Sequence, residues 1–510
     1  MPRFGTSQTS PDAVLRARKK RGGILESGQK LIESYQLRVN DVIVGVNIFS
    51  DEKEPVPLYN ISITNLSETT KIILEKIRQE FISQETQYIE TEGQPETEVI
   101  QSEFKKSILV LLQKYFPTAN KKTIDMLINY ILQQNIGLGH IEILLKDRNL
   151  EEIVINNANE PIWVYHRKHG WLKTNIYVPN EARIRYYSTV IGRDIGKEIT
   201  VLSPLMDAHL KTGDRVNATL RPISSKGNTI TIRKFAARPW TITDFLRENT
   251  ISYDAAALLW TAVQNELSII ITGGTASGKT SMLNVAANFF PPNQRIISLE
   301  DTRELMLPDI LHWVPLETRL PNPEGKGGIT MLDLVVNSLR MRPDRILVGE
   351  IRRRAEAEVL FEAMHTGHSV YGTLHANNVR ETINRLTQPP IELPRQMLSA
   401  LSLIVVQNIN RRNGRRRTLQ IGEIMHDGDA KTLMQLNMAK DTLEKINEPE
   451  TIYETLNLYT GLSKEEIKKD IEEKIDILKW MVSNNINDLN KIGLIISKYY
   501  RKQPFKNIIK

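Results

Sequence analysis

The segment GGTASGKT, residues 273–280, constrains the fold of this chain more than any other part of its sequence. It matches the pattern G-x-x-x-x-G-K-[ST] in full, the apolar stretch SIIIT precedes it, and SMLNVAANFF follows with a helical pattern. A strand, a glycine-rich loop and a helix in this order form a phosphate-binding loop at the positive end of the helix. An ordinary glycine-rich turn, the alternative interpretation, would not need these flanks. The segment therefore predicts a nucleotide site.

The residues of this loop have distinct expected roles. Glycines let the backbone N–H groups turn inward around the phosphates, Lys279 supplies charge to the β- and γ-phosphate oxygens, and Thr280 offers a hydroxyl to Mg²⁺. The predicted nucleotide-binding residues of this segment are Gly273, Gly274, Thr275, Ala276, Ser277, Gly278, Lys279, Thr280 and Ser281.

Two strands end in acidic residues that could take part in hydrolysis. Besides a phosphate-binding loop, hydrolysis needs one group at the metal ion and one at the attacking water. The strand RILVGE ends at Glu350, and IISLED ends at Glu300 and Asp301. Either acid could instead cap a following helix. Beside a phosphate-binding loop, the pair predicts Glu300 and Glu350 as catalytic residues, with Glu350 and Thr280 at the metal.

Three histidines lie close together in EAMHTGHSVYGTLHANN, residues 362–378. His375 ends a predicted strand whose tip should reach the same sheet edge, where an imidazole can sense the γ-phosphate. We expect His365 to be a packed or hydrogen-bonded helix residue and His368 to orient its loop. The alternative, a three-histidine metal site, has no cysteine or dedicated carboxylate partner nearby.

Composition limits the class of protein. With 40% apolar and 25% charged residues, the 510-residue chain is expected to fold into several globular domains. It has no cysteine, so disulfides and thiolate metal sites are excluded, and we expect no signal peptide or membrane-spanning segment. The basic runs LRARKKR (15–21) and RRNGRRR (411–417) could touch phosphate or an acidic membrane surface, or be solvated arms and turns.

Pattern changes along the chain divide it into regions. The predicted domains are a basic flexible arm at 1–30, an N-terminal subdomain at 31–135, a second α/β domain at 136–235, a hinge at 236–240, an ATPase domain at 241–430 and a helical region at 431–510.

Within these regions the periodicity predicts individual elements. The subdomain at 31–135 should contain short strands, a helix at 68–82, an acidic linker or exposed loop at 87–103 and two closing helices. The 136–235 domain should have an antiparallel sheet around a helix at 181–195. After the hinge, strands alternate with helices, which predicts a parallel sheet. Residues 404–424 should form a β-hairpin, because Asn413–Gly414 suits a type I′ turn.

In their order, GGTASGKT, ISLEDTREL, RMRPDRILVGEIR and HTGHSVYGTLHAN resemble the Walker A, Asp box, Walker B and His box of the type II/type IV secretion ATPase superfamily. The resemblance covers about residues 140–430 and implies an α/β fold. A C-terminal RecA-like P-loop ATPase domain would follow a smaller α+β N-terminal domain with an antiparallel sheet and an additional N-terminal subdomain. By the same resemblance, SPLMDAHLKTGDRVNATL and NTITIRKF lend arginines to the nucleotide. Arg215 and Arg233 are the γ-phosphate candidates, with Arg221 a weaker third, unless they are surface or strand-pairing arginines.

The resemblance also implies ATP and Mg²⁺ as ligands, a homo-hexameric ring, and a polytopic membrane platform protein as partner. The protein would be cytoplasmic and peripheral at the inner face of the membrane. Bacterial members usually have a four-cysteine zinc element, which this sequence lacks, so no zinc site is expected. That departure favours the archaeal branch, which drives archaellum or type IV pilus assembly, or conjugation-type ATPases.

Two other classes of function stay open at this level. A nucleic-acid motor on the same core is slightly favoured by the basic runs, but no nucleic-acid-binding module is recognisable, so this partner is not expected. A nucleotide switch that does not hydrolyse is disfavoured by Glu300 and Glu350. For the ATPase we expect the site at the seam between residues 141–235 and 241–430, so that hydrolysis moves the two domains.

Overall fold

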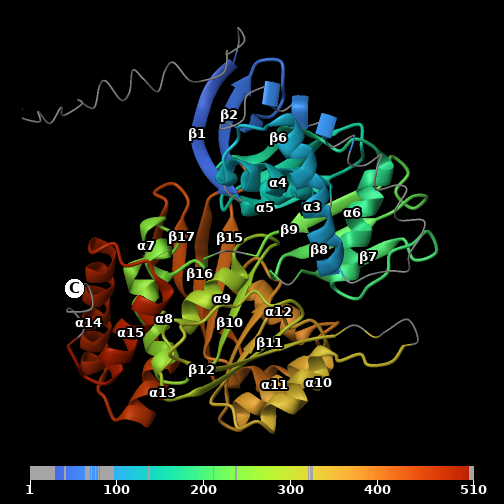
Figure 1. Ribbon diagram of the computed structural model, residues 1–510. Helices are drawn as coiled ribbons and strands as arrows, with labels where there is room; N and C mark the ends of the chain where they lie inside the picture. The colour runs from blue at the N-terminus through green and yellow to red at the C-terminus, as the bar shows by residue number, and fades with distance from the viewer. Residues whose placement is uncertain are drawn as a thin grey trace, which may run out of the picture. The chain divides into compact units, whose positions relative to one another are not determined.

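The computed structural model describes the chain from residue 29 to 504 with gaps (Figure 1). The described residues are 29–39, 42–63, 69–70, 72–74, 76–77, 80, 97–135, 138–210, 212–235, 238–319, 321 and 325–504. The basic run 15–21, nearly all of the expected arm and the first two residues of the expected hinge lie outside them. The chain separates into two compact units, Met1–Phe235 and Ala236–Lys510.

In the first unit, nine strands of the described residues form one sheet. They are β1 (Gln29–Val39), β2 (Val42–Asp51), β3 (Leu58–Ile63), β4 (Leu150–Ile155), β5 (Pro161–His166), β6 (Gly170–Tyr177), β7 (Leu205–His209), β8 (Arg215–Thr219) and β9 (Thr229–Arg233). The order is β1-β2-β3-β6-β5-β4-β9-β8-β7, and the pairs are antiparallel except β3 with β6. Side chains alternate between buried and partly exposed along β5, as expected for a sheet with one covered face.

Helices cover this sheet and form a small core of their own. They are α3 (Thr97–Tyr115), α4 (Lys121–Asn135), α5 (His140–Lys146) and α6 (Glu181–Asp194). Leu112 and Leu127 are buried where α3 meets α4, in a cluster separate from that of the sheet. Asn180 begins α6, because its side chain accepts a hydrogen bond from the Arg183 N–H.

The antiparallel sheet and both closing helices agree with the sequence, but one expectation was wrong. The expectation of an acidic linker or exposed loop at 87–103 was wrong from Thr97 on, because α3 starts there. Residues 87–96 lie outside the described part. The sheet also crosses the domain boundary expected near residue 135, since Leu58 of β3 pairs with Lys173 of β6. The domain division within the first 235 residues therefore stays a prediction. In the helix expected at 68–82, the described residues are helical.

The second unit has a sheet that is parallel on one side and antiparallel on the other. Its strands are β10 (Ile269–Gly273), β11 (Arg295–Glu300), β12 (His312–Glu317), β13 (Arg345–Val348), β14 (Ser369–Leu374), β15 (Leu403–Ile409), β16 (Arg416–Ile424), β17 (Ala430–Asn437) and β18 (Thr442–Lys445). The order is β12-β11-β13-β14-β10-β15-β16-β17-β18, with parallel pairing from β12 to β15. The expected mixed α/β fold is confirmed.

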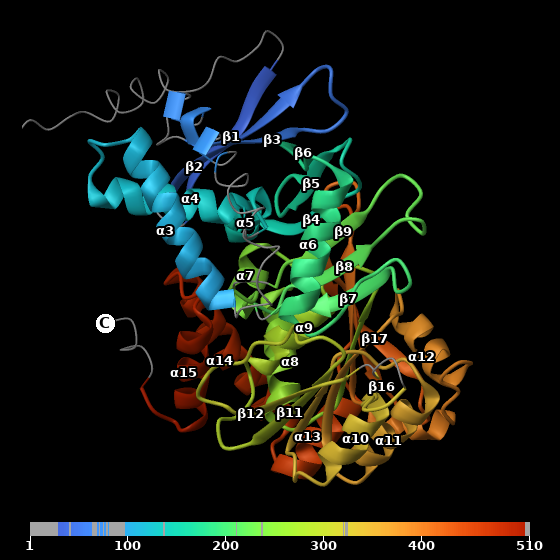
Figure 2. The ribbon, with the colours of Figure 1, turned by 45° about the vertical axis from the view of Figure 1, so that its right-hand side comes forward.

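Helices cover both faces of this sheet (Figure 2). They are α7 (Ile242–Arg247), α8 (Tyr253–Gln264), α9 (Lys279–Ala287), α10 (Met331–Leu339), α11 (Arg354–His365), α12 (Val379–Thr387), the 3₁₀ helix η1 (Arg395–Ala400), α13 (Thr451–Thr460), α14 (Lys464–Ser483) and α15 (Leu489–Tyr500). The central strand β10 separates two cores, because Ile269 and Ile271 face the α8–α14 side while Ile270 faces the α10–α12 side. None of the described helices has the length and apolar character required to cross a bilayer.

The hairpin expected at 404–424 is present as β15 and β16, but the expected turn type was wrong. A type I′ turn needs positive φ at both central residues. Of the two central residues, Gly414 has φ 70° and Asn413 is not in the positive-φ region. The connection is longer, and the Asn410 N–H bonds the Arg415 carbonyl at 2.8 Å. The Asn413 side chain accepts a hydrogen bond from the Arg415 N–H. This side-chain bond orders the longer loop, which takes the place of the expected two-residue turn.

The C-terminal region is an integral part of the second unit. It is helical as expected from Thr451 on, but Thr442–Lys445 is a strand, and β17 and β18 extend the sheet. The Tyr500 hydroxyl donates to the Phe289 carbonyl and accepts from the Trp260 indole N–H. These bonds fix α15 to α8 and to the residues that follow α9, the helix of the predicted phosphate loop.

Candidate nucleotide site

The loop 273–280 joins the buried strand β10 to α9, and its backbone explains the glycines. Gly273 has φ 153°, and a Cβ there would lie 2.3 Å from the Gln407 carbonyl oxygen. Gly278 is left-handed with φ 94° at the N-cap of α9, and Ala276 also has positive φ. The glycine spacing therefore produces a tight loop at the positive end of a helix, which is a suitable anion site.

Lys279 places its ammonium group against this loop. Its Nζ donates to the carbonyl oxygens of Gly273 and Gly274, both at 3.0 Å, and lies 3.4 Å from His375 Nδ1. Burial lowers the pKa of Lys279, while the carboxylates of Glu350 and Glu304 act in the opposite direction. The positive charge is thus held where phosphate oxygens would enter.

His375 connects the loop to an acidic group. Its Nε2 is 3.3 Å from Glu350 Oε1, and its other ring nitrogen faces Lys279. Burial and the Lys279 charge together lower the pKa of His375 below its usual value. Arg352 then bridges Glu350 at 2.7 Å and Asp301 at 2.6 Å. The ends of β13 and β14 thus meet beside the loop, as the sequence predicts from parallel strand order.

Glu300 differs from Glu350 in its surroundings. It is 2% exposed, and its Oε1 accepts hydrogen bonds from the N–H groups of Glu304 and Leu305 at 2.8 and 3.0 Å. Burial raises the pKa of Glu300 to about 7, partly offset by these two bonds. This carboxyl group therefore orders the turn that presents the exposed Glu304.

Glu304 is a candidate that the sequence analysis missed. It is exposed, and its negative charge opposes the lowering of the Lys279 pKa that burial causes. The sequence did contain a signal for this residue, because the segment ISLEDTREL has a second glutamate four residues after Glu300. Either carboxylate is therefore a candidate for the water-orienting role that was assigned to Glu300.

The oxygen donors expected at the metal have a suitable chemistry. Thr280 is the second residue of α9, and Glu350 follows β13 with a carboxylate that is 22% exposed. A hydroxyl and a carboxylate are the protein ligands that Mg²⁺ uses when phosphate oxygens and water complete its shell. Within the described ranges, no group of three or more His, Cys, Asp or Glu residues is arranged to hold a metal ion.

The other two histidines of the cluster have separate partners. His365, the last residue of α11, has its Nε2 3.2 Å from the Met397 carbonyl oxygen. His368 has its Nδ1 3.3 Å from the Ala363 carbonyl oxygen. His365 is thus a hydrogen-bonded helix residue, as expected from the sequence, and His368 bonds the end of the preceding helix.

The predicted arginines lie together in the first unit. Arg215 of β8 and Arg233 of β9 are directly opposite each other in the sheet register. Arg215 forms a two-point ion pair with Asp207, at 3.1 and 2.6 Å. Arg221 lies apart, and its guanidinium donates to the Lys226 carbonyl. The nucleotide role of Arg215 and Arg233 stays a prediction.

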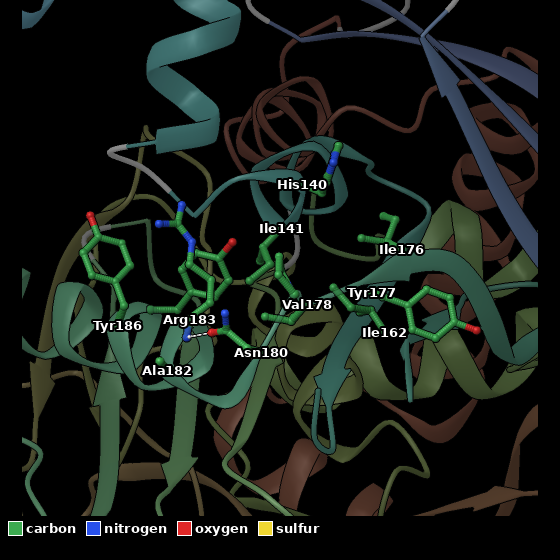
Figure 3. A pocket seen from close by; sticks show the side chains of 12 residues that line it. His140, Ile141, Ile162, Ile176, Tyr177, Val178, Asn180, Ala182, Arg183 and Tyr186 are labelled. Atoms are coloured by element: carbon green, nitrogen blue, oxygen red, sulfur yellow. Dashed lines mark hydrogen bonds between the residues drawn. The ribbon is translucent and has the colours of Figure 1, made fainter. Parts of the chain in front are cut away.

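The first unit also has a cavity of about 440 Å³ beside the start of α6 (Figure 3). Arg183 lies over the rings of Tyr186 and Tyr187, 4.7 and 4.9 Å from their centroids. The lining also includes His140 and Tyr177. None of the residues that the sequence analysis predicts for the nucleotide lines this cavity.

A glycine loop between a buried parallel strand and a helix, with a lysine and acidic strand ends beside it, defines a P-loop nucleotide-binding protein. Residues 198–487 match the family described as type II/IV secretion system protein. The family match spans more than half of the chain, which therefore belongs to this family of secretion ATPases. The resemblance inferred from the motifs is confirmed.

The chain is also similar to individual proteins. An uncharacterised protein of Methanocaldococcus jannaschii, MJ0900, is 36% identical over 387 residues, which are 73% of this chain and 69% of that protein. The type IV secretion system protein PtlH of Bordetella pertussis is 29% identical over 314 residues, which are 54% of this chain and 91% of PtlH. The X-ray structure of the Legionella pneumophila ATPase DotB aligns with a TM-score of 0.44 and 20% identity, over 72% of this chain and 93% of DotB.

Proposed function

We propose that the protein is a Mg²⁺-dependent ATPase, the motor of an archaellum or type IV pilus type of assembly or secretion machine. The proposal rests on one observation above all, the contact chain from Lys279 through His375 to Glu350 at the mouth of the loop 273–280. Family membership supports the same conclusion. Such a chain links a phosphate-binding charge, a sensor and a carboxylate within one site.

Each group has a role in this reaction. The N–H groups of residues 273–281 and Lys279 bind the phosphates, and Thr280 and Glu350 would hold Mg²⁺. When bound, the ion neutralises charge on the β- and γ-phosphates. Glu300 and Glu304 share the task of orienting the attacking water. Glu304, which is exposed, would contact the water, and the buried Glu300 holds the turn. His375 responds to loss of the γ-phosphoryl group because its ring lies between Lys279 and Glu350.

Arg215 and Arg233 would complete the site from the first unit when the units close on the triphosphate. Arg215 must then exchange its carboxylate partner Asp207 for phosphate oxygens. Hydrolysis removes the charge that holds the arginines, so the units separate again. In a homo-hexameric ring at the inner face of the membrane, such a cycle would act on a polytopic platform protein.

The conjugation-type machine remains the alternative on the same core. A nucleic-acid motor is less favoured, because the basic run 411–417 is partly engaged within the chain. Arg415 and Arg417 both pair with Asp441, and the Arg416 Nε bonds a loop carbonyl.

Two substitutions test the ATPase proposal. Lys279→Ala should weaken ATP binding, and Glu350→Gln should lower steady-state turnover by about a hundredfold or more, because each removes charge complementary to the triphosphate or its ion. Lys440→Ala, at an exposed lysine paired with Glu444, is the matched control. Normal hydrolysis by both site variants would refute the proposal.

The two Asp-box glutamates can be separated by the same assay. Glu304→Gln and Glu300→Gln should each spare nucleotide binding and lower kcat, with the larger loss for Glu304→Gln if Glu304 touches the water. A kcat unchanged by Glu300→Gln would remove Glu300 from the catalytic set. A kcat unchanged by Glu304→Gln would return the role to Glu300.

A further inference from the structure

The hairpin β15–β16 lies directly beside the phosphate loop. Strand β15 pairs with β10 up to Gly273, whose partner in the register is Gln407. The Gln407 side chain donates from Nε2 to the Thr418 hydroxyl of β16 at 2.9 Å, and both residues are buried. The start of β16 is therefore held in a fixed place next to the loop.

Arg416, the first residue of β16, contacts the loop itself. Its Nε donates to the Ala276 carbonyl oxygen at 3.0 Å, and its Cδ would lie 3.5 Å from a Cβ added at Gly278. Ala276 has φ 62°, a conformation that costs energy for a residue with a Cβ. Because a peptide group is planar, the bond to this carbonyl orients the Ala276–Ser277 peptide unit, including the Ser277 N–H in the loop.

The positive charge of Arg416, unlike the charges of its two neighbours, is not compensated by an acidic side chain of the described residues. Arg415 and Arg417 both form ion pairs with Asp441, at 3.4 and 2.7 Å. No carboxylate of the described residues forms an ion pair with Arg416, which is half-buried at the loop. A carbonyl partner uses one N–H group and leaves the positive charge uncompensated. An uncompensated guanidinium beside a helix N-terminus increases the attraction for an anion.

We propose that Arg416 is a positioning residue for the nucleotide, acting from the hairpin side of the loop. It fixes the Ala276 peptide in the shape that receives phosphate, and it adds positive charge at the edge of the site. This role rests on the proposed nucleotide function and adds a residue that the loop motif does not contain. Its effect is on nucleotide affinity, because Arg416 acts through the loop and not on the attacking water.

The test compares Arg416→Gln with Arg416→Lys and the matched control Arg415→Gln in the full chain. A fluorescent ATP analogue gives Kd at low and high salt, thermal unfolding is followed with and without the analogue, and kcat and KM are measured for ATP. Arg416→Gln should raise Kd and KM about tenfold at low salt, with kcat within about threefold, since one charge-assisted contact is lost. Arg416→Lys should recover most of the low-salt affinity, and Arg415→Gln should stay near wild type.

The unfolding curves separate a binding role from a merely structural one. The unfolding midpoint without ligand should be the same for Arg416→Gln and the wild type, while the stabilisation by the analogue should shrink. The inference is overturned if Arg416→Gln binds within twofold of the wild type, or if Arg415→Gln weakens binding as much. Failure of the wild type itself to bind the analogue would instead overturn the proposed function.

Discussion

At the scale of single residues, Glu300 shows how burial alone changes the chemistry of a carboxyl group. The sequence places it at a strand end, as it does Glu350, and assigns both the same kind of role. The structure buries Glu300 and turns it toward two backbone N–H groups, whereas Glu350 contacts His375 and Arg352. Such a difference depends on what covers the strand end, and no pattern of neighbouring residues specifies that.

The raised pKa of Glu300 leads to a prediction about stability and pH. The pKa is raised from 4.5 to about 7, so the folded protein keeps a proton in that window that the unfolded chain releases. The free energy of unfolding therefore falls as the pH rises from 4.5 to 7, by at most about 3 kcal/mol. Glu300→Gln cannot titrate and should lose this slope. Urea unfolding at several pH values between 5 and 8 should show that, as the pH rises, the free energy of unfolding of the variant increases relative to that of the wild type. A constant difference would contradict the burial argument.

At the scale of elements, the sequence predicted the helices, strands and loops whose own residues have a clear periodicity or turn signal. The buried run of β10, the glycines of the loop and the closing helix α4 were all predicted. Two of the missed strands lack such a pattern: β12 contains Pro315, which is tolerated because β12 is an edge strand, and β18 is only four residues long. Their pairing with the neighbouring strand makes them strands, and that information lies elsewhere in the chain.

The helix α14 contains a buried charge whose partner should be essential for stability. The Lys474 side chain is fully buried, and its Nζ contacts Asp470 and the Thr261 hydroxyl of α8. Burial lowers the pKa of Lys474, and Asp470 opposes this shift. Asp470→Ala leaves the ammonium without its carboxylate and should destabilise the protein by about 3 kcal/mol, measured by denaturant unfolding.

A control for this prediction lies on the same helix. Asp476 is exposed, and its side chain is 3.7 Å from Lys479. Asp476→Ala should change the free energy of unfolding by well under about 1 kcal/mol, as surface ion pairs usually do. Equal effects of the two substitutions would show that burial of Lys474 does not depend on Asp470.

At the scale of the whole molecule, the family and the mixed α/β fold could be predicted, while the pairing of distant segments could not. Leu58 of β3 pairs with Lys173 of β6, more than a hundred residues later. Sequence periodicity predicts that both are strands but contains no information about which strands become neighbours. The same holds for Tyr500, whose hydroxyl reaches the Phe289 carbonyl behind the phosphate loop.

The proposed closure of the two units on ATP is the prediction that belongs to this scale. The chain has no cysteine, so single cysteines introduced at the exposed residues Thr189 and Gln396 would accept a donor and an acceptor dye, one on each unit. A non-hydrolysable ATP analogue should change the transfer efficiency, and ADP should restore the starting value. Arg233→Gln should bind the analogue but lose most of the change, because Arg233 is expected to hold the γ-phosphate.

Two controls make this experiment decisive. Arg167→Gln removes another arginine of the first unit, one that pairs with Glu151 at 3.7 Å, and should respond like the wild type. Dilution of labelled chains with an excess of unlabelled chains excludes transfer between subunits of a ring. An unaltered response of Arg233→Gln would mean that the first unit does not sense the γ-phosphate through this arginine. The coupling between hydrolysis and movement would then have to rest on Arg215, or pass through the second unit by way of the link from Lys279 through His375 to Glu350.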